Sequence, residues 1–231
     1  MEFCRLLMAS NESTERTADI VRKEILARLR KGILSPGAQI IVPEIARDLN
    51  VSRVPVREAL HILAGEGIVD LSKNKSARIR PIREKDITDM LRLLACLGAF
   101  SLELAGENLH CPTARRRITA GIDQIIAALA RRDVQGFYQA AHAFHLDLIR
   151  ITDNFFVTKA FESLHMDYFN RALSTRLPGS HWKTFEKNYT SIGDALKAKN
   201  FSKASTIYTK HMQWAIGMIL SESRPLKAVE G

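Results

Sequence analysis

Along most of this chain, apolar residues recur every three or four positions, the spacing that places side chains on one face of an α-helix. The first such stretch covers residues 14–31 and ends at Gly32, a residue type that often terminates helices. Residues 35–40 (SPGAQI) predict a turn. Residues 43–50 predict a short helix with Pro43 at its first position, where the missing N–H breaks no helical hydrogen bond. The chain therefore begins with two helices joined by a turn.

The next stretch, NVSRVPVREAL, has a proline between two arginines that stand at helical spacing. Proline in a helix interior costs about 3 kcal/mol, so a helix that includes Pro55 must begin just before it. Ser52 is a favoured N-cap residue and makes Pro55 the third helical residue, whose N–H would have no partner inside the helix. Because Pro55 has no N–H, the Ser52 hydroxyl should accept the cap hydrogen bond from the N–H of Val54. We therefore predict a third helix that starts after Ser52 and ends at Gly65 and Gly67.

Two short segments after this helix, IVDLS (68–72) and ARIRP (77–81), predict strands on either side of a polar turn, KNKS (73–76). Beyond a basic joint at residues 80–86, the remaining apolar patterns are helical and cover residues 84–108, 113–132, 134–151, 155–175, 182–199 and 201–222. We predict a mainly α protein, in which an N-terminal winged helix-turn-helix (three helices plus a β-hairpin) is followed by an all-helical bundle. The expected parts are a flexible arm at residues 1–13, the winged helix-turn-helix at 14–81, the helical domain at 82–223 and a tail at 224–231.

The net charge of +9 favours an anionic partner such as nucleic acid. Cys4, Cys96 and Cys111 form no CxxC pair, which favours a reducing compartment and argues against a disulfide scaffold or a zinc ribbon. The first ten residues are too few and too charged for a signal peptide. No run approaches the ~18 apolar residues that indicate a membrane span. We expect a cytoplasmic protein without a membrane partner.

Arg53 and Arg57 lie one turn apart at the start of the predicted third helix. A short helix and a turn precede them, as in a helix-turn-helix motif, whose second helix enters the DNA major groove by its N-terminal residues. An arginine fork can bond guanine O6 and N7 together, or one phosphate. Taken alone, the pair would be interpreted as a solvated helix face. Its place between a short helix and a hairpin that is basic over residues 73–80 favours DNA binding.

The segment PGAQI…PEIARDLNVSRVPVREALHILAGEGIVDL resembles the winged-helix domain of GntR-family transcription regulators, and the resemblance extends over residues 18–81. It implies DNA contacts at Ser52, Arg53 and Arg57 and at a wing glycine, which is Ser76 in this chain. Pro43 stands where related proteins often carry arginine, so Arg47 is a candidate substitute. The predicted DNA-binding residues are Ser52, Arg53, Arg57, Arg47, Lys75, Ser76 and Arg78.

The helical half resembles the FCD-type effector-binding domain of the FadR-like subfamily through AFHLDLIRITDN (143–154) and residues 192–211. The resemblance implies a domain that dimerises, binds a small organic acid or a related metabolite, and often holds a divalent metal through one Asp and three His. Those four ligand positions are Ala141, His145, Tyr189 and His211 in this chain, and an Arg and a Glu common on the first helix correspond to Leu94 and Gly98. Two of the four metal ligands are therefore retained.

Several helices carry an apolar stripe with one polar tip, which is typical of a mostly apolar ligand pocket with few polar groups. One stripe consists of Ala204, Ile207, His211, Ala215 and Met218. The predicted effector-pocket residues are His145, Tyr189, His211 and His142. We assign no metal site, because zinc bound by the histidines would want a fourth group, and the cofactor is left unassigned.

The leading hypothesis is a ligand-responsive repressor that binds double-stranded DNA at a pseudo-palindromic operator as a homodimer. An alternative is a regulator whose helical domain has lost its effector site and only dimerises. A third hypothesis is a metal-dependent hydrolase built on His142, His145 and His211. The chain has no HExxH motif, nucleophile elbow or phosphate loop, so we predict that it is not an enzyme.

Overall fold

The computed structural model describes residues 16–72, 76–108, 112–174 and 181–221, and the chain divides into two compact units between Ile82 and Arg83. The arm predicted at residues 1–13 and the tail predicted at 224–231 lie outside the described residues. Of the helices described, none is long and apolar enough to cross a membrane.

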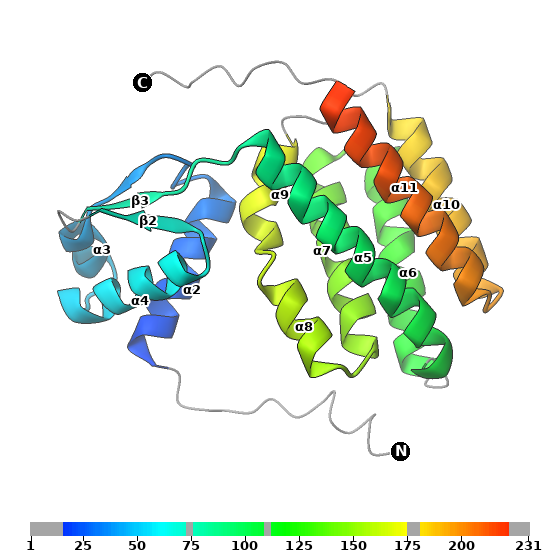
Figure 1. Cartoon of the computed structure of the whole chain (residues 1–231), viewed down its shortest axis with the longest axis horizontal. Coiled ribbons are helices and arrows are strands. Elements are labelled where there is room, and N and C mark those ends of the chain that lie inside the picture. The colour runs from blue at the N-terminus through cyan, green and yellow to red at the C-terminus, as the bar shows by residue number, and fades with distance from the viewer. Residues whose placement is uncertain (1–15, 73–75, 109–111, 175–180, 222–231) are drawn as a thin grey trace. The chain divides into compact units, whose positions relative to one another are not determined.

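The N-terminal unit is a three-helix cluster with a small antiparallel sheet (Figure 1). Its elements are α2 (Thr17–Lys31), β1 (Gln39–Ile40), α3 (Val42–Asp48), α4 (Arg53–Gly65), β2 (Val69–Leu71) and β3 (Ala77–Ile79). The apolar faces of α2 and α4 pack together and bury Val21, Ile25, Val56, Leu60 and Leu63. The predicted winged helix-turn-helix is confirmed.

The sheet has a third strand that the sequence did not predict. The strand order is β1-β3-β2, and Gln39 and Ile40 pair with Arg78 and Ala77 of β3. The sequence of residues 35–40 predicts a turn only. A two-residue strand is too short to show an alternating pattern, so its pairing with β3 is what defines it.

The start of α4 agrees with the sequence analysis except for its cap. Ser52 is the N-cap residue with an extended backbone (φ −71°, ψ 167°), and the helix begins at Arg53 with Pro55 in its first turn. The Ser52 side chain makes no cap hydrogen bond, so the predicted bond to the N–H of Val54 is wrong. Pro55 and the preceding turn set the backbone conformation at the N-cap. They do not set the orientation of the Ser52 hydroxyl.

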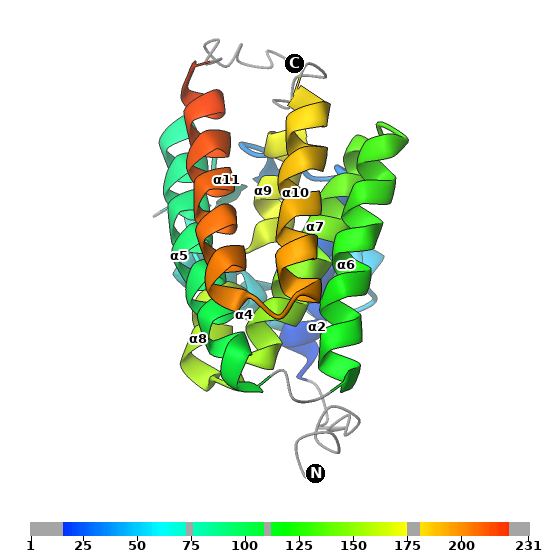
Figure 2. The ribbon, with the colours of Figure 1, turned by 90° about the vertical axis from the view of Figure 1, so that its right-hand side faces the viewer.

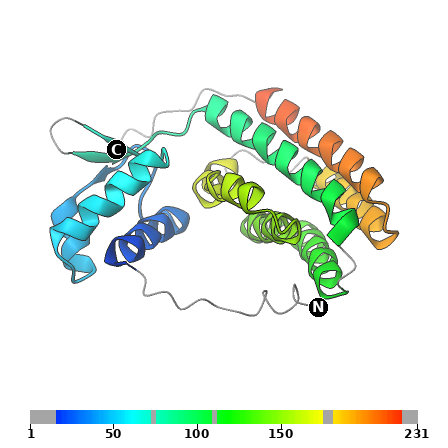
Figure 3. The same cartoon turned by 60° about the horizontal axis from the view of Figure 1, so that its bottom comes forward.

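The second unit is a bundle of helices. Its elements are α5 (Glu84–Asn108), α6 (Pro112–Ala130), α7 (Val134–Ile151), α8 (Phe155–Glu162), α9 (Met166–Ser174), α10 (Trp182–Lys197) and α11 (Phe201–Ser221). α5 and α11 run side by side (Figure 3). α10 lies between α11 and α6, and α7 packs against α5, α6, α8 and α9 (Figure 2).

The helix predicted over residues 155–175 is in fact two, α8 and α9. Leu164 donates its N–H to the carbonyl of Phe161, three residues back, and His165 has a positive φ of 45° that ends the helical path. Neither glycine nor proline marks this break in the sequence. The break turns α9 so that it packs against α7 and contributes to the cavity described below.

Candidate nucleic-acid interface and ligand cavity

The turn between α3 and α4 is held by backbone hydrogen bonds. The N–H of Val51 donates to the carbonyl of Ala46 (2.9 Å), and the N–H of Asn50 donates to the carbonyl of Arg47 (3.1 Å). Asn50 has a positive φ of 53°, a conformation that asparagine tolerates better than most residues. This turn directs the start of α4, with Ser52 and Arg53, away from the end of α3.

Ion pairs join α2 to both helices of this motif. Arg28 of α2 bonds Asp48 at the end of α3 (3.0 Å) and Glu24 of its own helix (3.0 Å), and these two carboxylates raise its pKa. Arg22 bonds Glu66 at the C-terminal end of α4 (3.0 Å). These pairs hold α3 and α4 on α2.

Arg53 and Arg57 project from the first two turns of α4 into solvent. Neither makes an ion pair with any residue that the structure describes, whereas the arginines that position the motif are paired. Ser52 is exposed at the same end of the helix, and its hydroxyl makes no cap bond. The sequence-predicted residues therefore lie together at the N-terminal end of α4, with their donors available.

The other predicted DNA-binding residues lie on α3 and in the hairpin. The side chain of Arg47 is 77% exposed, and its ion pair with Asp48 is long (3.9 Å). Arg78 is exposed on β3. Ser76 closes the base of the wing, since its carbonyl accepts from the N–H of Ser72 (2.9 Å) and the two hydroxyls lie 2.6 Å apart. Lys75 lies outside the described residues.

A cavity of about 70 Å³ lies in the helical unit and is lined by α5, α7, α9, α10 and α11. All four predicted pocket residues, His142, His145, Tyr189 and His211, line it. Most of its remaining wall is aliphatic, methionine or phenylalanine. The structure thus brings together polar residues from three helices that the sequence analysis selected.

His145 is buried, and both of its ring nitrogens are engaged. Nδ1 lies 2.6 Å from the carbonyl of Ala141, so Nδ1 carries the proton that it donates. Nε2 therefore accepts from the hydroxyl of Tyr208 (3.0 Å), which also lies 3.3 Å from the carbonyl of Leu94. Burial, and then the nearby His142, lower the pKa of His145 to about 4, and the hydrogen bond to Ala141 opposes that shift. His145 is therefore a neutral ring with a fixed tautomer at pH 7.

Tyr208 is fully buried, and the sequence analysis missed it. The proposed stripe included the neighbouring Ile207, which is half-buried, whereas Tyr208 faces the core of α5 and α7. A Cβ atom on Gly98 would overlap the ring and hydroxyl of Tyr208. Because Gly98 has no side chain, the Tyr208 ring fits against α5 at this position. The two residues are far apart in the sequence, so only the contact between α5 and α11 reveals this fit.

His211 belongs to an aromatic wall of the cavity. Its ring centroid lies 4.8 Å from that of Tyr189 and 5.5 Å from that of Phe185, both edge to face. The side-chain amide of Asn188 donates to His211 Nδ1 (3.1 Å), which leaves the proton of the neutral ring on Nε2. Burial, followed by the nearby His145, lowers the pKa of His211 to about 3. Burial raises the pKa of Tyr189, so its phenol is also neutral at pH 7.

These residues do not fit the divalent metal that the resemblance implied. Nε2 of His145 is occupied by the Tyr208 hydroxyl, and Ala141 offers only a carbonyl that already accepts from His145. Among the described residues, no three His, Cys, Asp or Glu side chains come together as a metal site would require. Zinc needs three or four such ligands, so we derive no metal chemistry for this cavity.

Comparison with known proteins gives the following similarities. The sequence profile described as "Bacterial regulatory proteins, gntR family" matches residues 17–79, and the profile of the FCD domain matches residues 89–213. A probable D-xylose utilization operon transcriptional repressor of Paenarthrobacter nicotinovorans is 26% identical over 197 residues, which cover 84% of this chain and 85% of that protein. An uncharacterized HTH-type transcriptional regulator in the TAR-I ttuE-ttuC' intergenic region of Agrobacterium vitis is 30% identical over 125 residues, which cover 52% of this chain and 72% of that protein.

Among solved structures, the fold is similar to that of E. coli McbR/YncC, with a TM-score of 0.73 and 21% sequence identity over 90% of this chain and 99% of that chain. At this identity, the similarity shows that the two proteins share a fold. It extends over both units of the chain.

Proposed function

We propose that this chain, which belongs to the GntR family of bacterial regulatory proteins and has an FCD domain, is a dimeric repressor controlled by a small-molecule effector. Its membership of this family makes it a DNA-binding transcription regulator and not an enzyme. It would act in the cytoplasm on a pseudo-palindromic operator. The observation that carries the proposal is the pair of exposed arginines, Arg53 and Arg57, without ion pairs among the described residues at the start of α4.

The proposed mode of DNA binding places the N-terminal end of α4 in the major groove. Arg53 and Arg57 would bond guanine edges or phosphates through their forks. The first-turn N–H groups of α4, which the Ser52 side chain does not cap, would favour a phosphate at the same place. Arg47 and the wing residues Lys75, Ser76 and Arg78 would contact the backbone, where contacts position the protein without reading bases.

The DNA contacts are tested with single variants in a gel-shift assay, using duplexes selected by the protein from a random pool. Arg53→Ala and Arg57→Ala should each lower specific affinity by ~1–3 kcal/mol. Arg131→Ala is a matched control, because it removes the same charge from an exposed site in the helical unit. If both α4 variants bind like the wild type, the proposed interface is wrong.

The proposed dimer rests on exposed apolar residues of α5. Leu93 is 43% exposed and Phe100 is 45% exposed, and their spacing of seven places them on one helix face. Burying such residues against a second copy would stabilise a two-fold dimer, and that symmetry matches a pseudo-palindromic operator.

Phe100→Asp should shift the protein towards the monomer in sedimentation experiments, whereas Thr206→Asp at an exposed site of α11 should not.

The proposed effector site is the cavity between α5, α7, α9, α10 and α11. A ligand bound there would alter operator affinity through the dimer, with a coupling free energy of ~1–3 kcal/mol.

The second candidate function is a helical domain that only dimerises. It is favoured by the satisfied hydrogen bonds of His145 and by the loss of the acid-binding residues at Leu94 and Gly98. A ligand that binds and changes operator affinity would exclude that second candidate.

A further inference from the structure

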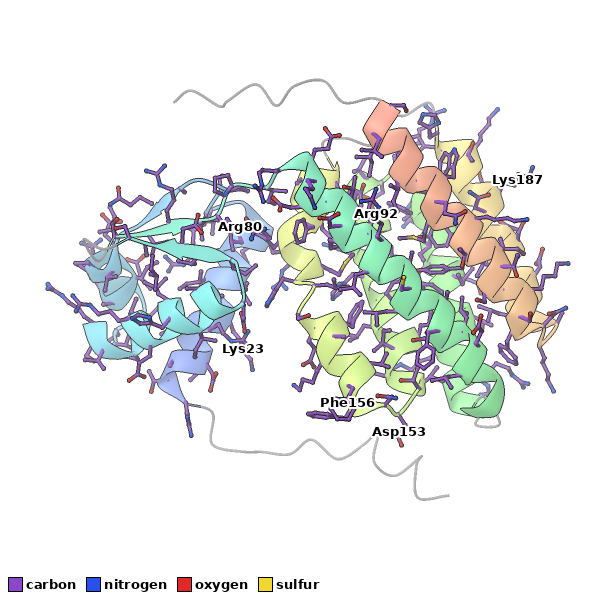
Figure 4. The ribbon with its side chains drawn as sticks, viewed as in Figure 1. Lys23, Arg80, Arg92, Asp153, Phe156 and Lys187 are labelled. Atoms are coloured by element: carbon purple, nitrogen blue, oxygen red, sulfur yellow. The ribbon has the colours of Figure 1, made fainter. Side chains whose placement is uncertain are left out.

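The described wall of the cavity carries no carboxylate and no lysine or arginine. Arg92 of α5 and Lys187 of α10 are exposed, and Lys187 extends outward from the bundle (Figure 4). Asp147 of α7 pairs with Arg117 of α6 (2.8 Å). A ligand in the cavity would therefore find no counter-charge among these groups.

Two histidines of the wall, His145 and His211, are neutral and hydrogen-bonded. His145 is bonded at both ring nitrogens, and Asn188 occupies Nδ1 of His211. An ionised carboxylate placed against these two rings would lose its hydration without gaining a partner charge from them, and such burial is strongly unfavourable. The same argument applies to an ammonium group. The expected exclusion of a carboxylate differs from the sequence resemblance, which implied that an organic acid binds here.

Asn170 of α9 provides a specific polar group that the packing of the described residues leaves unused. Its side-chain oxygen is buried at the cavity wall and has no hydrogen-bond partner among the described residues. Leaving a buried acceptor unbonded is costly, so a ligand that donates a hydrogen bond would recover that cost. The site therefore favours a ligand with a hydroxyl or a neutral N–H beside an apolar body.

The volume limits the size of the ligand. The cavity of about 70 Å³ is smaller than the engineered cavity of about 150 Å³ that holds benzene in another protein. Three methionines, Met166, Met212 and Met218, form part of its wall and can shift to admit a single ring. One ring or one short alkyl chain is therefore the upper limit for the ligand, and a ring requires these methionines to shift.

We propose that the cavity binds a small, uncharged, largely apolar molecule that carries one hydrogen-bond donor, such as an alcohol or a phenol, with Asn170 as the acceptor. This inference rests on the proposed effector function of the same cavity. It names the ligand class and predicts that charged analogues of equal size are rejected.

The first experiment compares benzyl alcohol, benzoate and benzylammonium, which share one ring and differ in charge. Binding to the full-length protein at pH 7.5 is measured by calorimetry and by thermal stabilisation, which reports ligand affinity directly. Benzyl alcohol should bind at least about tenfold more tightly than either ion, since about 1.4 kcal/mol corresponds to a factor of ten and an unpaired buried charge costs more. Equal or tighter binding of benzoate or benzylammonium, or no binding of any of the three, would overturn the proposal.

The second experiment tests the acceptor. Asn170→Leu should weaken benzyl alcohol about tenfold and leave toluene, which has no donor, unchanged. Gln139→Leu, an exposed site on α7, is the matched control and should change neither. An equal loss for both ligands would show that Asn170 has only a structural role and would overturn its assignment as the acceptor.

A gel-shift with the selected duplex, run on the same preparations, distinguishes an error in the ligand class from an error in the proposed function. If DNA binding is intact and depends on Arg53 while benzyl alcohol does not bind, the ligand class is wrong and the DNA-binding part of the proposed function is unaffected. If benzyl alcohol binds and operator affinity stays constant, the ligand class is correct and the proposed control of DNA binding is wrong.

Discussion

Arg53 and Arg57 in the N-terminal unit are exposed and make no ion pair with a described residue, whereas His145 and His211 in the helical unit are buried and each is held by hydrogen bonds. The first arrangement keeps donors available for a polyanion outside the protein. The second satisfies polar groups inside a core, where an unbonded group is costly. The two units therefore suit opposite kinds of proposed ligand: a polyanion at a charged surface, and an uncharged molecule held by shape and hydrogen bonding in a cavity.

The largest expected difference between the units is in their dependence on pH. His145 and His211 have folded pKa values of about 4 and about 3, below the ordinary 6.5. Below pH 6.5 the unfolded chain takes up protons that the folded bundle does not, so folded stability is complete above that pH and falls as pH decreases. Each histidine contributes up to ~1.4 kcal/mol per pH unit, and the loss by pH 4 is on the order of 5 kcal/mol.

Denaturant titrations at several pH values measure this loss, and Trp182 and Trp214 report on the helical unit because both lie in it. His211→Gln should remove about half of the dependence between pH 6.5 and 4. A wild-type helical unit that keeps its full stability at pH 4 would contradict the buried, neutral state of both rings.

A second difference concerns the effect of truncating one side chain. Tyr208→Ala should lower the free energy of unfolding by ~3–5 kcal/mol, because it leaves a cavity in the core and removes the donor to His145. Arg57→Ala removes an exposed side chain, and its effect on stability should stay within about 0.5 kcal/mol. Tyr208→Phe isolates the hydroxyl and should cost ~1–3 kcal/mol. If Tyr208→Phe is neutral, the hydrogen bond to His145 does not support the core.

The fit of Tyr208 against α5 can be tested at two helical glycines. Gly98→Ala places a methyl group on the Tyr208 ring, so we expect a loss of ~1–3 kcal/mol through overpacking. Gly217→Ala in α11 meets no atom within 4 Å of the new Cβ and should gain up to ~1 kcal/mol from helix propensity. Thermal melts of the two variants should move in opposite directions, and a shared gain would show that Tyr208 does not need the space at Gly98.

The smallest expected effects separate the roles of the arginines on the DNA surface. Arg47→Ala, if it removes a phosphate contact, should reduce the slope of log affinity against log salt concentration by ~1 and weaken all sequences alike. Arg53→Ala, if it removes a base contact, should relax the preference at one position of the selected site. Binding measured at several salt concentrations on matched and mutated duplexes distinguishes them, and Arg131→Ala should leave both quantities unchanged.

The secondary structure was predictable where local chemistry sets it. Pro55 restricts where α4 can begin, and long apolar periodicities gave the ends of α5 and α7 (Glu84–Asn108 and Val134–Ile151). The misses are elements that depend on distant partners. β1 exists because β3 pairs with it, and the break at His165 lets α9 pack on α7 although no residue type in the sequence signals it.

The sequence by itself placed Arg53 and Arg57 together at the start of a helix, because helical spacing after a start that Pro55 restricts depends only on neighbours along the chain. It also identified His142, His145, Tyr189 and His211 as pocket residues, through stripes on separate helices and through resemblance. Only the tertiary structure decided what that pocket is. The donor to His145 comes from Tyr208, which is 63 residues away, and the space for Tyr208 comes from Gly98 on another helix. The charge and the free hydrogen-bonding groups of a cavity are set by such long-range contacts, which the order of residues along the chain does not show.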